Sequence, residues 1–199
     1  MIVNRRSLIL ASVLGSALMA ALPAWAQPVM VEGQGFDRRV SLAGSELQLN
    51  GTGVRAVAWF KGYAAGLYLR SPSRNVVQVL AQPGPKRLQL RMLQDVPAAE
   101  FVKAFRKGVE RNTAPAELPQ LAERMASFEA LVGALGQVRK GDVVNLDLEP
   151  GRGTLFSVNG TLRGEAIAGE EFFAALLRSF VGDKPYDNKL KAGLLAGTV

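Results

Sequence analysis

Two apolar runs in close succession constrain the fold more than any other part of this chain. Val54–Phe60 forms the first run and Tyr63–Leu69 the second, and both have the length and composition of β-strands. The first run follows the glycine pair Gly51 and Gly53 and carries one cation, Arg55, among apolar neighbours. A buried, unpaired charge is costly, so we expect the guanidinium to meet an anion. That anion is either a protein carboxylate or the acid group of a ligand.

Three other segments alternate apolar and polar residues, which is typical of half-buried strands: residues 46–49, 87–92 and 144–149. In the last of them Asp147 and Glu149 fall on the polar phase, so we expect both to be solvated. Farther on, Asn159-Gly160 separates two further short runs, and this pair is the strongest short-range signal for a β-hairpin.

Three segments have helical periodicity instead. Apolar residues recur at helical spacing in residues 101–109, which include Phe101 and Phe105, and again in residues 121–135 and 172–180. A strand-rich first half, two central helices, a hairpin and a closing helix predict an α+β domain. We expect an antiparallel sheet with a layer of helices on one face.

The first 26 residues have the pattern of a secretory signal peptide. Arg5 and Arg6 precede an apolar core, and Ala24-Trp25-Ala26 supplies the small-x-small cleavage pattern. We therefore expect cleavage after Ala26 and a periplasmic or secreted protein, without stable membrane insertion once the signal is removed. The pair of arginines leaves the general secretory and the twin-arginine routes both open.

Composition narrows the chemistry of the remaining residues 27–199, which suffice for a single domain. Without Arg5 and Arg6 the chain keeps 22 of its 24 basic residues against 17 acidic ones, a net charge of +5. These basic residues are scattered, which favours a solvated surface over a nucleic-acid site. The chain has no histidine and no cysteine, which excludes Ser-His-Asp and Cys-His catalysis and disfavours a zinc or copper site. We expect no metal and no cofactor.

Three blocks of the sequence resemble the chalcone isomerase family, and most closely its bacterial chalcone isomerase-like branch. They are G-x-G-V-R at 51–55, F-K-x-Y-x-A-G-L-Y-L at 60–69, and the ending V-G-D-K-P at 181–185 with the leucines that follow. The resemblance spans roughly Phe36 to Ala196. It implies a chalcone isomerase-like open-faced β-sandwich, with a ligand cleft between the sheet and the helices.

In that family an arginine pairs with the anionic oxygen of the ligand, and Arg55 matches it directly. The true isomerases close a ring by phenolate attack on an enone, and hydroxyl groups stabilise the enolate that develops. Tyr63 stands where the plant enzymes have a threonine. Their catalytic tyrosine is missing, because the corresponding region reads Ala98-Ala99-Glu100-Phe101. The resemblance thus implies the fold, the arginine and an apolar cleft, without the full catalytic set.

We therefore predict an exported protein that binds a small amphipathic anion, such as a fatty acid, without converting it. The predicted ligand-binding residues are Arg55, Tyr63, Trp59, Phe101 and Phe105. Two alternatives stay open. One is an intramolecular lyase of the chalcone isomerase type. The other is an envelope structural or interaction protein, in which Arg55 pairs internally and side chains fill the cleft.

Overall fold

The computed structural model describes residues 27–197, so the predicted signal peptide lies outside the described residues. The strands are β1 (Val29–Val31), β2 (Gln34–Phe36), β3 (Arg39–Leu42), β4 (Ser45–Val57), β5 (Phe60–Leu69), β6 (Lys86–Met92), β7 (Val96–Pro97), β8 (Gln137–Val138), β9 (Val143–Glu149), β10 (Gly153–Val158) and β11 (Thr161–Leu162). The helices are α1 (Val76–Ala81), α2 (Ala98–Asn112), α3 (Leu118–Gly133), α4 (Glu170–Val181) and α5 (Asn188–Leu194). Within this part of the chain, no helix is both long and apolar enough to cross a bilayer.

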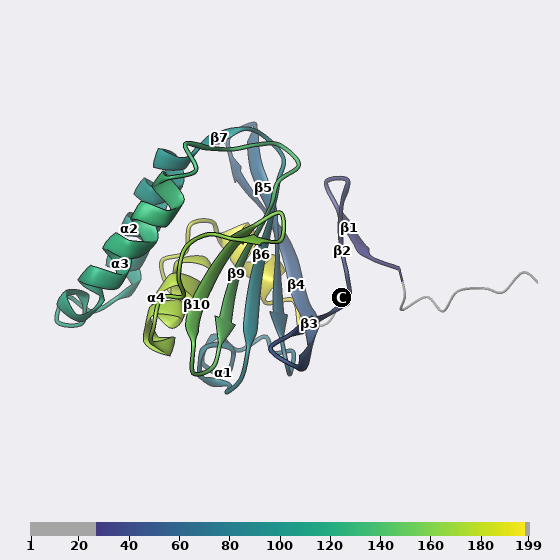
Figure 1. The fold of residues 1–199 in the computed structure, drawn as a ribbon. Helices are drawn as coiled ribbons and strands as arrows, with labels where there is room; N and C mark the ends of the chain where they lie inside the picture. Colours follow the sequence, from purple (N-terminus) through teal and green to yellow (C-terminus); the bar gives the residue numbers. More distant parts are fainter. Residues whose placement is uncertain (1–26, 198–199) are drawn as a thin grey trace, which may run out of the picture.

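Seven strands form one curled antiparallel sheet in the order β11-β10-β9-β6-β5-β4-β3 (Figure 1). The predicted hairpin at Asn159-Gly160 joins β10 to β11, and both residues have positive φ, as a two-residue hairpin turn requires. The short pair β1–β2 lies against the other face of the sheet, and β7 pairs with β8 beside the helices.

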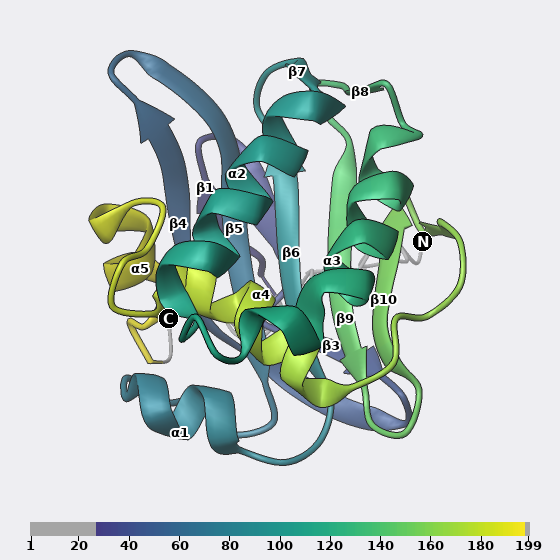
Figure 2. The same cartoon turned by 90° about the vertical axis from the view of Figure 1, so that its left-hand side faces the viewer.

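Helices α2, α3 and α4 cover one face of the sheet (Figure 2). The strand alternation explains this layer, because Leu88, Leu90 and Met92 on β6 belong to the main core together with Phe105 of α2 and Phe172 of α4. The prediction of an antiparallel sheet with helices on one face, and hence of an α+β fold, is confirmed.

The polar phase of the strands faces the opposite side, where the prediction for Asp147 is wrong. Asp147 is only 7% exposed. Arg87, its neighbour on β6, donates Nε to Oδ1 and Nη2 to Oδ2, each at 2.7 Å. The Arg87 side chain covers the carboxylate. Strand alternation therefore predicted the face on which Asp147 lies, but not its low exposure to solvent.

The glycine pair that precedes Arg55 lets α5 approach the backbone of β4. A Cβ on Gly51 would lie 2.2 Å from the carbonyl oxygen of Gly193, and one on Gly53 would lie 2.9 Å from that of Leu190. Atoms of a larger residue would overlap the helix backbone. These glycines therefore place α5, and with it the residue that caps its N-terminus, beside Arg55.

Candidate functional site

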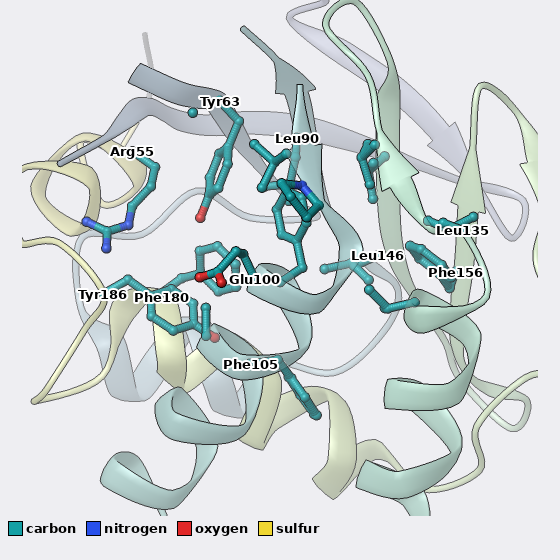
Figure 3. Close-up of a pocket in the computed structure, with 18 of the residues that line it drawn as sticks. Arg55, Tyr63, Leu90, Glu100, Phe105, Leu135, Leu146, Phe156, Phe180 and Tyr186 are labelled. Carbon is teal, nitrogen blue, oxygen red and sulfur yellow. The ribbon is translucent and has the colours of Figure 1, made fainter. Parts of the chain in front are cut away.

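A cavity of about 360 Å³ lies between the helices and the sheet. Its walls are mainly apolar and aromatic. The sheet contributes Leu90, Val144, Leu146 and Phe156, and the helices contribute Phe101, Phe105, Phe128, Val132, Leu176 and Phe180. Polar groups gather at one end, where Figure 3 shows Arg55, Tyr63 and Tyr186, whereas Leu135, Leu146 and Phe156 lie at the other end. Volumes of about 300–1,000 Å³ with few polar groups are typical of small-molecule sites.

Arg55 lies on β4 opposite Tyr63 of β5, at a point where the pairing register shifts. Such an irregularity changes the direction of a side chain. The side chain of Arg55 is 29% exposed and borders the cavity. Its Nη1 donates to the carbonyl of Ala56 at 3.2 Å and to Oδ2 of Asp187 at 3.4 Å. Among residues 27–197, the Nε and Nη2 groups of Arg55 have no hydrogen-bond partner. These two donor groups of the guanidinium therefore remain for a ligand.

Asp187 contacts Arg55 with one carboxylate oxygen and the N-terminus of α5 with the other. Its Oδ1 caps α5 by accepting the backbone N–H groups of Lys189 at 2.8 Å and Leu190 at 3.1 Å. Burial disfavours the charged carboxylate, but hydrogen bonds from backbone amides and the Arg55 cation outweigh that cost and lower the pKa of Asp187. The contact to Arg55 is long for a charged hydrogen bond. An internal acid therefore holds the guanidinium loosely, and the cavity lies next to it.

Tyr63 places a phenol in the cavity near Arg55 (Figure 3). Its ring stacks on that of Phe101, with centroids 6.2 Å apart and planes inclined by 29°. Burial, followed by the neighbouring Tyr186 phenol, raises the pKa of Tyr63 far above its ordinary value, and the Arg55 cation offsets this only in part. Tyr63 therefore keeps its proton and can donate a hydrogen bond to an anion.

Tyr186 supplies a second phenol, which the sequence analysis missed. It lines the cavity, and its ring meets that of Phe180 edge-on at 4.9 Å. Burial raises the pKa of Tyr186 to about 12. This hydroxyl also stays protonated at neutral pH, and a hydrogen bond with Ser179 and the Arg55 cation offset part of the effect of burial on its pKa. The sequence signal for it was weak: a tyrosine and an aspartate directly before the last helix.

Contacts with α2 position Tyr186. A Cβ on Gly108 would lie 2.5 Å from Cε1 of the Tyr186 ring and 2.6 Å from its hydroxyl oxygen, so this helix position must be glycine for the ring to lie there. One turn later, Asn112 donates Nδ2 to the carbonyl of Lys184 at 2.8 Å and accepts the Lys184 N–H at 2.9 Å. These two amide contacts fix the loop that carries Tyr186.

Four of the five predicted site residues line the cavity: Arg55, Tyr63, Phe101 and Phe105. The expectation for Trp59 is corrected, because this residue is 92% exposed and does not border the cavity. It lies in the turn between β4 and β5, where strand alternation no longer governs direction. Its neighbour Phe60 borders the cavity instead, while still 44% exposed.

Two exposed acids, Asp95 and Glu100, also border the cavity, and Figure 3 shows the Glu100 carboxylate on the side of the cavity that holds Tyr63 and Tyr186. No cluster of three or more metal-binding side chains occurs between residues 27 and 197. The arrangement offers a guanidinium fork and two neutral phenols at one end of an apolar chamber. Chemically, it can hold an oxyanion at that end and a hydrocarbon body behind it.

Comparisons with known proteins agree with this architecture. The model of a family described as chalcone isomerase-like matches residues 28–196. Among solved structures, a fatty-acid binding protein of Arabidopsis thaliana superimposes with a TM-score of 0.68. It is 15% identical in sequence, and the match covers 85% of this chain and 96% of that one. At this identity the match shows a shared fold. A comparison with curated proteins gives no match.

Proposed function

The chain belongs to the chalcone isomerase-like family, and from this premise we propose that it binds a small amphipathic anion, such as a fatty acid, without converting it. The observation that carries the proposal is the cavity of about 360 Å³ with Arg55 at one end and apolar side chains around the rest. The acid group pairs with Arg55 and accepts hydrogen bonds from Tyr63 and Tyr186. The tail lies among the phenylalanines and leucines. The fatty-acid binding protein with the same fold supports this class of ligand.

The two parts of such a ligand contribute different properties. Each methylene moved from water into the apolar chamber contributes about 0.8 kcal/mol, so ten of them contribute about 8 kcal/mol. A hydrogen bond to a charged group contributes about 1.5–3 kcal/mol. The tail therefore provides most of the affinity, and Arg55 determines which end of the ligand lies at the polar side.

Isothermal titration calorimetry with dodecanoate and decanoate tests this proposal. We expect decanoate to bind about 15-fold more weakly, because it lacks two methylenes. Arg55→Gln should weaken dodecanoate binding about tenfold or more. Arg91→Gln is the matched control, since Arg91 lies on the other face of the sheet, 5.3 Å from the ring centre of Phe36. The proposal would be overturned if dodecanoate did not bind the unmodified protein, or if the two substitutions had equal effects on its binding.

A second candidate function is ring closure of a phenolic enone. The specific observation in its favour is that Tyr63 and Tyr186 place two protonated phenols near Arg55, although α2 carries no tyrosine. Two neutral donors beside a cation suit a developing enolate. Loss of chalcone enone absorbance on incubation with the protein, abolished by Arg55→Gln, would favour this function over simple binding.

We propose further that the protein acts after export, since residues 1–26 have the sequence pattern of a cleaved signal. N-terminal sequencing of the protein recovered from the periplasm of a Gram-negative host tests this point. The expected first residue is Gln27, and retention of Met1 in the cytoplasm would contradict export.

A further inference from the structure

The turn between β4 and β5 presents an exposed indole. Trp59 is 92% exposed, and it makes no ring contact with another aromatic residue of the described chain. Phe60 beside it is 44% exposed. Large apolar side chains left in water at adjacent positions are unfavourable and typically mark an interaction surface. We call residues 58–61 the hairpin tip.

The hairpin tip adjoins the opening of the cavity. Phe60 belongs to both, because it lines the cavity and is still partly exposed. A Cβ on Gly62 would lie 3.5 Å from Cε1 of Phe60, so the phenyl ring lies across this glycine. Across the opening, the exposed lining residues Pro97 and Glu100 belong to β7 and the first turn of α2. A ligand that enters here passes the hairpin tip.

The hairpin itself contains two cations, and each is paired with an acid from another segment. Between residues 51 and 69 it contains Arg55 and Lys61 and no acidic residue. Lys61 pairs with Glu32 at 2.8 Å, and this pair is at the surface, where such contacts contribute little. Arg55 pairs with Asp187, and the exposed acids Asp95 and Glu100 border the opening, so the hairpin adds no net positive charge there and its aromatic tip carries the contact.

A second basic pair lies at the same end of the sheet. Arg139 and Lys140 precede β9, whose first residues run beside the last residues of β6. Neither side chain forms an ion pair with another residue of the described chain. The nearby acids Asp142 and Asp95 accept the backbone N–H groups of Arg139 and Lys140, respectively. The exposed side chains of Arg139 and Lys140 thus lie at the end of the sheet that carries the aromatic tip, together with these two acids.

We propose that the hairpin tip docks on the surface of a phospholipid bilayer, with the Trp59 indole among the headgroups. Indoles favour this boundary because the ring is apolar and its N–H is polar. Docking turns the cavity opening toward the membrane, where amphipathic acids are concentrated. The contact is peripheral, with basic side chains facing anionic headgroups. The identity of the cargo rests on the proposed function, whereas the docking itself does not.

Vesicle binding by residues 27–199 tests the proposal. Among the described residues, both apolar clusters consist of residues between 29 and 195, which this segment contains, and Trp59 is the only tryptophan between 27 and 199. With vesicles of phosphatidylglycerol and phosphatidylcholine, we expect the Trp59 emission to shift to shorter wavelength and the protein to sediment with the vesicles. Pure phosphatidylcholine should bind it more weakly, and added salt should weaken binding to the anionic vesicles.

Two variants give the decisive comparison. Trp59→Ala should lower the vesicle partition coefficient about tenfold. Val77→Ser is the matched control, because Val77 is 72% exposed on α1, at the opposite end of the molecule (Figure 2), and it should bind vesicles like the unmodified protein. Both variants should bind dodecanoate in solution normally, so loss of docking is distinct from loss of the cavity site. An unshifted emission, equal vesicle binding by both variants, or Trp59-dependent self-association without lipid would overturn the proposal.

Discussion

Replacing Gly108 with alanine should weaken ligand binding without lowering the stability of the fold. The added Cβ would lie 2.5 Å from Cε1 of Tyr186. Carbon atoms pack at about 3.5–4.0 Å, so the Tyr186 ring must retreat by about 1 Å. Phe180 meets that ring edge-on at 4.9 Å and limits where it can move. In the proposed complex, this movement takes the Tyr186 hydroxyl away from the oxyanion that Arg55 holds.

The loss of one hydrogen bond to a charged ligand costs about 1.5–3 kcal/mol, so dodecanoate should bind about tenfold or more weakly. The helix should not be weakened by the new residue itself, because alanine is favoured over glycine in a helix interior by about 1 kcal/mol. Calorimetric titration together with urea unfolding measures both quantities. Gly133→Ala is the matched control, since nothing lies within 4 Å of its Cβ position. Unchanged dodecanoate affinity in Gly108→Ala would refute the assignment of Tyr186 as a donor.

Three further predictions concern charged groups. Asp187→Asn keeps a cap for α5 but removes the negative charge that competes for Arg55, so dodecanoate should bind up to about fivefold more tightly in calorimetry; weaker binding would contradict this competition. Because folding lowers the pKa of Asp187, its contribution to stability is present above about pH 4 and is lost as the pH falls through the lower, folded-state pKa. Urea unfolding at pH 6 and pH 3 should show a larger loss for the unmodified protein than for Asp187→Asn, and equal losses would exclude this role. Asp147→Ala should destabilise the fold by about 3 kcal/mol because it leaves Arg87 unpaired, whereas Arg87→Met with Asp147→Leu should be close to neutral in the same assay; equal destabilisation by both would refute the pairing argument.

The sequence predicted the layers of the fold because its information there is periodic. Alternation identified the strand faces, helical spacing identified α2, α3 and α4, and Asn159-Gly160 identified a hairpin. The same patterns placed Tyr63 on the face of the sheet that packs against the helices, and Phe105 on the face of α2 that packs against the sheet. Arg55 stood out because a charge interrupts an apolar strand.

Features that depend on contacts between distant segments could not be predicted in this way. Trp59 lies in a turn, where neither strand alternation nor helical spacing indicates the direction of a side chain. Tyr186 lies on an irregular loop, and its position depends on Gly108 and Asn112, more than 70 residues earlier in the chain. Asp147 has the spacing of an exposed strand residue, but the long side chain of Arg87 covers it.

The glycine pair Gly51 and Gly53 illustrates the same limit. In the sequence it marks the start of the block that contains Arg55. In the structure it allows α5 to contact β4, which brings Asp187 to the guanidinium. The two glycines are therefore explained by the packing of α5 against β4, which the local sequence pattern does not reveal.

In the proposed complex, Arg55 holds the acid group of a ligand whose tail fills the cavity. The most direct test compares dodecanoate with dodecanol, which has the same tail but no charge, in the unmodified protein and in Arg55→Gln. We expect the unmodified protein to prefer dodecanoate by about tenfold or more and Arg55→Gln to bind the two ligands almost equally. An equal preference for dodecanoate in both proteins would show that the acid group lies elsewhere.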